Sequence, residues 1–110
     1  MPALTVVGSI NLDLVAKTDR LPRPGETVSD ASFTQVPGGK GANQAVAAAK
    51  LGADVTLIAA VGDDSFAGLA LAGLHEANVS LQLVTKDGPT GVALIVVDAH
   101  GENTIVVAPG

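Results

Sequence analysis

Short apolar runs that end at glycine recur along the chain and predict the strands of a core sheet. One run covers residues 4–7 and ends at Gly8, and another covers residues 55–61 and ends at Gly62. Short runs dominated by apolar residues are typical of strands buried on both faces of a parallel sheet. Residues 81–85 are expected to form a third core strand.

Two segments between these runs have the periodicity of helices. Residues 41–51 carry apolar side chains at i, i+3, i+4 and i+7, and Gly52 follows where a helix commonly ends. Residues 66–77 predict a second helix, which Asp64 or Ser65 can cap. The expected buried stripes consist of Ala42, Ala45, Val46 and Ala49 in the first helix and of Phe66, Leu69, Ala70 and Leu74 in the second. The order strand, helix, strand predicts a parallel crossover.

The remaining segments indicate extended chain outside this core. Residues 12–16 predict a further strand, and residues 27–36 an edge strand that the sequence PGG at 37–39 ends. Residues 91–97 and 104–107 flank a turn-forming segment and predict a β-hairpin. The whole pattern predicts an α/β fold with a parallel sheet core flanked by helices and a small β appendage.

Composition narrows the class of protein. The 110 residues suit one domain, and six Lys and Arg against eleven Asp and Glu leave a net charge of -5. This charge argues against binding to nucleic acid or to an anionic membrane surface. No apolar run approaches the roughly 18 residues of a membrane span, and the chain contains no cysteine for a disulfide or a thiolate site. With no signal peptide visible at its start, the protein is expected to be cytoplasmic.

The balance of apolar and charged residues is unusual for a free-standing domain. Hydrophobic residues make up 47% of the chain and charged residues 15%, against roughly 25% charged residues in ordinary soluble domains. We therefore expect the chain either to bury surface in an oligomer or to be part of a larger protein.

The sequence GGKGANQ at residues 38–44 is the first of two motifs that could carry chemistry. It lies between an extended segment and a helix, where glycines let the backbone approach a ligand and free N–H groups favour an anion or a polar oxygen. It is not a Walker A loop, because its lysine precedes glycine rather than Ser or Thr. A structural turn is the alternative interpretation.

The second motif is GSINLD at residues 8–13, directly after the first strand. Ligands of open parallel sheets bind at this edge. Asn11 and Asp13 fall on the same side of an extended chain, so their amide and carboxylate could bind neighbouring hydroxyl groups. The alternative is that both are turn residues at the end of a strand.

Together these motifs resemble the N-terminal signature of the ribokinase-like carbohydrate kinases of the phosphofructokinase B type. Gly52 and Gly62 follow the glycine-rich run as in that signature, and PGET at 24–27, TGVA at 90–93 and GEN at 101–103 are similarly placed. The resemblance extends from about residue 4 to residue 110. It implies ATP-dependent phosphorylation of D-ribose at the 5-hydroxyl, aided by Mg²⁺ and K⁺.

The resemblance also implies roles for individual residues. Its sugar pocket would consist of Asn11, Asp13, Gly39, Lys40, Gly41 and Asn43. Residues 12–36 and 90–107 resemble the β-sheet lid of the family, in which Ala93 and Ile95 would cover the sugar. The same lid commonly pairs two subunits, so a homodimer is implied.

The catalytic Asp of the family belongs to a Gly-Ala-Gly-Asp motif that has no counterpart in this sequence. The nucleotide pocket and the cation loop of the family lie in the same missing region. We therefore expect residues 1–110 to be the N-terminal part of one ribokinase-like domain, without catalytic, cofactor-binding or metal-binding residues and inactive alone. Two alternatives stay open, another sugar or nucleoside kinase of the same fold and a non-catalytic sugar-binding or dimerising module.

Overall fold

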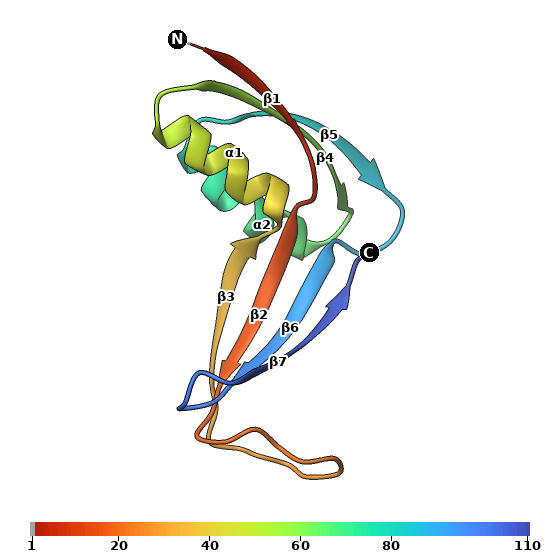
Figure 1. The fold of residues 1–110 in the computed structure, drawn as a ribbon. Coiled ribbons are helices and arrows are strands. Elements are labelled where there is room, and N and C mark those ends of the chain that lie inside the picture. The colour runs from red at the N-terminus through yellow and green to blue at the C-terminus, as the bar shows by residue number, and fades with distance from the viewer. Residues whose placement is uncertain (1) are drawn as a thin grey trace.

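The computed structural model describes residues 2–110, which form two β-sheets and two α-helices (Figure 1). In chain order the elements are β1 (Ala3–Val7), β2 (Asn11–Lys17), β3 (Ser32–Gly38), α1 (Lys40–Lys50), β4 (Asp54–Gly62), α2 (Ser65–Glu76), β5 (Ser80–Lys86), β6 (Gly91–Val97) and β7 (Asn103–Ala108). A three-stranded sheet has the order β1-β4-β5, and a four-stranded sheet has the order β3-β2-β6-β7. Neither of the helices described is long and apolar enough to cross a membrane.

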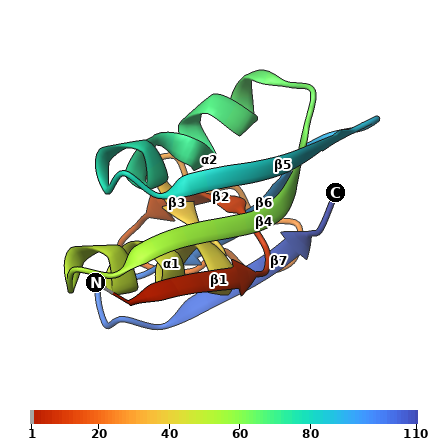
Figure 2. The ribbon, with the colours of Figure 1, turned by 90° about the horizontal axis from the view of Figure 1, so that it is seen from above.

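The hydrophobic core lies between the three-stranded sheet and the two helices, which cover the same face of that sheet (Figure 2). All pairs in this sheet are parallel, with β4 in the centre. Leu12 of β2 is fully buried and extends the core toward the second sheet. The core side chains of β4 and of the helices are Val55, Leu57, Ala59, Val61, Ala42, Ala45, Ala70 and Leu74. The predicted α/β class is confirmed.

The start of α2 and the end of α1 lie at the residues that the sequence indicates for them. The carboxylate of Asp64 accepts a hydrogen bond from the N–H of Ala67 at 3.1 Å and so caps α2. After α1, Gly52 has a φ of 98°, and the N–H groups of Gly52 and Ala53 donate to carbonyls of the last helical turn at 3.0 and 3.1 Å. This is the Schellman arrangement, which glycine permits because it has no Cβ.

Three sequence-based expectations about these elements are wrong. β1 was expected to be buried on both faces, but four of its five residues are exposed, because β1 is an edge strand and, within the described residues, both helices cover the same single face of the sheet (Figure 2). The strand expected at residues 27–36 begins at Ser32 and continues through Pro37 to Gly38, which is possible because β3 is an edge strand. Leu69 is 43% exposed because the buried stripe of α2 is narrow and centred on Ala70 and Leu74.

The four-stranded sheet extends away from the core, as Figure 1 shows. β2 and β6 run parallel in its centre, and β3 and β7 are antiparallel edge strands. The register pairs Asp13 with Ala93, and Ile95 lies two residues further on the same face. Leu94 and Val106 are paired on the opposite face. One face of the sheet therefore carries Asp13 together with the apolar side chains of Ala93 and Ile95. The opposite face carries the apolar pair Leu94 and Val106.

The loop between β2 and β3, residues 18–31, is held by an ion pair. The guanidinium of Arg20 donates to both carboxylate oxygens of Glu26, and the backbone N–H of Arg23 donates to Glu26 Oε1 at 3.1 Å. These charge-assisted bonds, the one from Arg20 above all, lower the pKa of Glu26 to about 2.

The ion pair predicts that the pKa of Glu26 depends on the Arg20 side chain. In an NMR titration of the Glu26 carboxyl carbon, Arg20→Gln is expected to raise the midpoint toward the ordinary value of about 4.3. Arg23→Gln is the matched control and should leave the midpoint unchanged, because Arg23 binds Glu26 through its backbone. Identical titrations of the native and Arg20→Gln chains would contradict this account.

Candidate functional site

Two loops that are far apart in the sequence meet beyond the carboxyl end of β1. β1 continues into β2 through residues 8–10, and β3 continues into α1 through Gly39. The N–H of Ala42, in the first turn of α1, donates to the carbonyl of Ser9 at 3.1 Å. The structure thus brings the two polar motifs of the sequence into direct contact.

Glycine is required where these two loops touch. Gly39 has a φ of 98°, and a Cβ at this position would lie 2.5 Å from the carbonyl oxygen of Ser9. A Cβ on Gly41 would lie 2.7 Å from the Cα of Gly8. The glycines therefore have a packing role between the loops, which sequence reasoning did not assign to them. Because these residues have no side chains, a ligand bound next to the loops could also approach their backbone closely.

Asn11 and Asp13 lie on the same face of β2, as their alternation predicts. Asn11 pairs with Gly38 on one side and with Gly91 on the other. The side-chain oxygen of Asn11 lies 2.6 Å from the position of a Cβ on Gly91, and Asp13 Oδ1 lies 2.8 Å from the position of a Cβ on Gly38. The neighbouring glycines thus make room for both polar side chains.

The first turn of α1 adds exposed polar groups to this region. Lys40 and Asn43 are both exposed, and Gly41 between them is buried. The N–H of Asn43 donates to the carbonyl of Gly39 at 2.9 Å, which closes the first turn. No acidic side chain lies in this turn, and the amino terminus of α1 and the Lys40 ammonium both contribute positive charge here.

An open cavity of about 480 Å³ lies beside the loops, at the carboxyl ends of β1, β4 and β5. Its volume falls within the roughly 300–1,000 Å³ of small-molecule sites. The lining consists of Val7, Gly8, Ser9, Ile10, Asn11, Ile58, Ala59, Ala60, Val84, Lys86 and Pro109. Of the six predicted pocket residues only Asn11 lines the cavity, and the other five lie outside its lining: Asp13, Gly39, Lys40, Gly41 and Asn43. Lys86 also lines the cavity, and the sequence analysis did not identify it. Its position at the carboxyl end of a core strand was the signal that could have indicated it.

The predicted cover residues lie on the same face of the four-stranded sheet as Asp13. Ala93 is the direct register partner of Asp13 and is 7% exposed. Ile95 follows on the same face and is half-buried. The structure therefore brings Ala93 and Asp13 together and places Ile95 further from the core.

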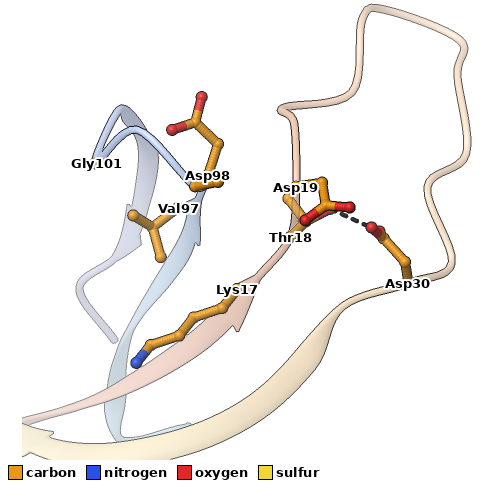
Figure 3. A pocket seen from close by; sticks show the side chains of 8 residues that line it. Lys17, Thr18, Asp19, Asp30, Val97, Asp98 and Gly101 are labelled. Atoms are coloured by element: carbon orange, nitrogen blue, oxygen red, sulfur yellow. Dashed lines mark hydrogen bonds between the residues drawn. The ribbon is translucent and has the colours of Figure 1, made fainter.

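A second open cavity, of about 470 Å³, lies at the far end of the four-stranded sheet (Figure 3). Lys17 and three aspartates, Asp19, Asp30 and Asp98, are among its lining residues. The hydroxyl of Thr18 donates to Asp30 Oδ1 at 2.7 Å, which lowers the pKa of Asp30. This bond joins the end of β2 to the loop before β3, so the Asp30 carboxylate has a structural role in holding this loop.

Thr90, to which sequence reasoning gave no role of its own, is 1% exposed at the start of β6. Its hydroxyl donates to Asp64 Oδ1 at 2.7 Å, and its backbone N–H donates to Asp64 Oδ2 at 2.8 Å. The same hydroxyl accepts a hydrogen bond from the N–H of Gly62 at 3.0 Å. The bond from the Thr90 hydroxyl, followed by that from its N–H, lowers the pKa of Asp64.

The lowered pKa of Asp64 makes stability depend on pH in a defined direction. The group contributes stability above its unfolded pKa, about 3.9, and loses it as pH falls through the lower folded value. In urea unfolding followed by circular dichroism, Asp64→Asn is expected to unfold more easily at pH 7 and to depend less on pH below about 4. Asp63→Asn, a change at the exposed neighbour, should keep the native dependence. The same pH dependence in Asp64→Asn as in the native chain would refute this assignment.

No group of three or more His, Cys, Asp or Glu side chains within residues 2–110 is arranged to hold a metal ion. We assign neither Mg²⁺ nor K⁺ to residues of this chain.

The chain is similar to carbohydrate kinases in sequence and in structure. The model of the family described as "pfkB family carbohydrate kinase" matches residues 1–110. Bacillus subtilis ribokinase is 46% identical over 112 residues, covering 100% of this chain and 38% of that protein. The structure of ribokinase from Giardia lamblia matches with a TM-score of 0.88 at 36% identity, covering 98% of this chain and 36% of the other. Arabidopsis thaliana ribokinase complexed with ribose and ATP matches with a TM-score of 0.82 at 34% identity, covering 97% of this chain and 36% of the other. The chain thus spans little more than a third of the length of these relatives.

Proposed function

Because the chain belongs to the pfkB family of carbohydrate kinases, we propose that it supplies the sugar-binding part of an ATP-dependent kinase that phosphorylates D-ribose at its 5-hydroxyl. The observation that carries the proposal is the meeting of Asn11 and Asp13 with the glycine-rich loop before α1. An amide and a carboxylate on one strand face, beside a helix amino terminus, suit the neighbouring hydroxyls of a neutral sugar. We also propose that the protein is cytoplasmic, because none of its apolar runs approaches the length of a membrane span.

Each of these groups has a proposed role in holding the sugar. The Asp13 carboxylate accepts hydrogen bonds from ribose hydroxyls, and the Asn11 amide both donates and accepts. The facing wall consists of Gly39, Lys40, Gly41 and Asn43. Ala93 and Ile95 form an apolar cover that excludes water, which would otherwise compete with ribose for the phosphoryl group. Residues 12–36 and 90–107 are the lid in this proposal, and residues 1–110 are the N-terminal part of one domain.

ATP is the proposed phosphoryl donor, since a similar ribokinase was solved with ribose and ATP. Transfer from ATP requires a base near the acceptor hydroxyl and stabilisation of charge on the γ-phosphoryl. Mg²⁺ and K⁺ are the further cofactors proposed for the complete enzyme, at sites outside residues 1–110.

The test is a chimera in which this chain replaces the matching N-terminal part of Bacillus subtilis ribokinase, to which it is 46% identical. We expect ADP release that depends on ribose and exceeds that with fructose or adenosine. A preference for fructose or adenosine would favour another sugar or nucleoside kinase. Ribose binding without turnover would favour a non-catalytic module, and the absence of both would overturn the proposal.

The 110-residue chain alone is expected to release no ADP in response to ribose. Its proposed site would bind the sugar, but its sequence has no recognisable nucleotide-binding motif to position ATP. A coupled ADP assay with the purified chain measures this, with a no-protein sample as the control. Ribose-dependent ADP release well above that control would place the catalytic centre within residues 1–110.

We also propose that the four-stranded sheet pairs two copies of the chain. Its edge strands β3 and β7 are unpaired on their outer sides within the described residues. On the face opposite Asp13, three apolar residues are largely exposed: Phe33 is 65% exposed, Leu94 48% and Val106 64%. Isolated proteins rarely leave such edges and apolar patches open to water.

Sedimentation of the chimera at micromolar concentration is expected to show a dimer, and Leu94→Glu combined with Val106→Glu is expected to give a monomer. The charges would have to be buried without partners in the interface, which is strongly unfavourable. Leu51→Glu, at a residue 90% exposed at the end of α1, is the control and should remain dimeric. A native chimera that sediments as a monomer would count against pairing.

A further inference from the structure

We propose that Asp64 and Thr90 are positioning residues that fix the four-stranded sheet relative to the core and thereby hold Asn11 at the sugar site. The effect on sugar binding rests on the proposed function. The positioning of one sheet against the other does not depend on it.

The second entry of the chain into the four-stranded sheet depends on these two residues. Within residues 2–110 the chain enters that sheet at β2, through residues 8–10, and again at β6, through residues 87–90. The first connection is packed against α1 by backbone contacts. In the second, residues 87–89 are exposed, and Thr90 is the first residue that is buried. The start of β6 is therefore anchored at Thr90.

The Asp64 carboxylate joins this anchor to the core. Asp64 Oδ1 accepts from the Thr90 hydroxyl and from the N–H of Ala67 in α2, and Oδ2 accepts from the N–H of Thr90. Gly62, the last residue of β4, donates to the same hydroxyl. A Cβ on Gly62 would lie 2.3 Å from the Thr90 nitrogen, so the two backbones are in close contact. One side chain thus ties β6 to α2, beside the end of β4.

Displacement of the start of β6 away from this point would break several of these bonds together. A buried donor or acceptor that loses its partner incurs its full desolvation penalty, so this movement is strongly opposed. Thr90 has almost no exposed surface from which water could replace the lost bonds.

The anchor is one residue away from the candidate sugar site. Gly91 follows Thr90 and is the register partner of Asn11, whose side-chain oxygen lies 2.6 Å from the position of a Cβ on Gly91. Ala93, two residues later, is the register partner of Asp13. A displacement of Thr90 therefore shifts the strand against which Asn11 and Asp13 lie.

Spin-label distances in the 110-residue chain test the positioning without any ligand. The chain has no cysteine, so Glu76→Cys on α2 and His100→Cys in the loop before β7 give each chain one label pair at exposed positions. An excess of unlabelled chain removes the distances between the two copies of the proposed dimer. We expect a narrow distance distribution in this chain and with Thr90→Ser, which keeps the hydroxyl. Thr90→Val, which keeps the shape without the hydroxyl, should broaden or displace the distribution.

Two further variants separate positioning from helix capping and from general effects of the substitution. Asp64→Ser keeps a residue that caps helices well but lacks the second oxygen that binds Thr90, so it should also broaden the distribution. Thr104→Val, at an exposed position of β7, is the matched control and should leave it narrow. Unchanged distributions in both Thr90→Val and Asp64→Ser would overturn the inference. Loss of the native circular dichroism spectrum in both would also overturn it, because the bonds would then serve global stability.

Kinetics of the chimera test the link to sugar binding. Thr90→Val is expected to raise KM for ribose roughly 10-fold and to leave KM for ATP unchanged, and Thr90→Ser to restore the native value. A changed label distance with an unchanged KM for ribose would overturn the link to the sugar site. A chimera without any response to ribose would refute the proposed function, and the label distances would still decide the positioning.

Discussion

Replacing Asp13 with alanine in the chimera is expected to lower kcat/KM for ribose by roughly 10- to 150-fold and to leave KM for ATP unchanged. The carboxylate lies above Gly38, on the face of β2 that also carries Asn11. Hydrogen bonds to an ionised group contribute about 1.5–3 kcal/mol each, and truncation to alanine removes every such bond from ribose at once.

Two companion variants make the result specific to the carboxylate of Asp13. Asp13→Asn keeps the size and one acceptor oxygen and should have a smaller effect than alanine. Asp54→Ala removes an exposed carboxylate at the opposite end of the core sheet and should leave ribose kinetics unchanged. Native ribose kinetics in Asp13→Ala would remove Asp13 from the site.

Replacing Gly39 with alanine is expected to destabilise the chain and to abolish ribose turnover in the chimera. An alanine at a φ of 98° is strained, and its Cβ would lie 2.5 Å from the carbonyl oxygen of Ser9. The strain alone costs on the order of 1–3 kcal/mol, and relief of the clash would separate the two loops of the candidate site. The free energy of unfolding in urea, followed by circular dichroism, measures the first effect, and ADP release measures the second.

Gly73→Ala is the matched control for this substitution and should have the opposite sign. Nothing lies within 4 Å of a Cβ at Gly73, which is inside α2. Alanine is favoured over glycine in a helix by about 0.8–1.0 kcal/mol, so this variant should be more stable than the native chain. A Gly39→Ala chain as stable as the native one would contradict this account, because it would show that the loop at Gly39 can move away from Ser9 without loss of stability.

The resemblance to the family was visible because its motifs are continuous in the sequence. The run at residues 38–44 and the motif at residues 8–13 were recognised in combination, and the family match over residues 1–110 confirms that recognition. Nothing in either motif shows that the N–H of Ala42 donates to the carbonyl of Ser9, because that contact joins residues on different elements. The roles of the individual site residues stay predictions.

Thr90 illustrates the limit of a local pattern. In the sequence it is one threonine between a turn and an apolar strand, a position typical of an exposed loop residue. In the structure it is 1% exposed and bound to Asp64, which lies 26 positions earlier. The prediction that Asp64 caps α2 is confirmed, but the second use of its carboxylate depends on where β6 begins.

By itself the sequence determined the two helices, the Asp64 cap of α2, the glycine that ends α1 and the alternation that puts Asn11 and Asp13 on one face, because each depends on residues a few positions apart. The tertiary structure alone decided that β1 is exposed, that β3 continues through Pro37, and that the two polar motifs meet. Exposure, strand order and loop contacts depend on which distant segments pack together. The cost of closing those long loops is repaid only by the contacts of the whole fold, which no short stretch of sequence contains.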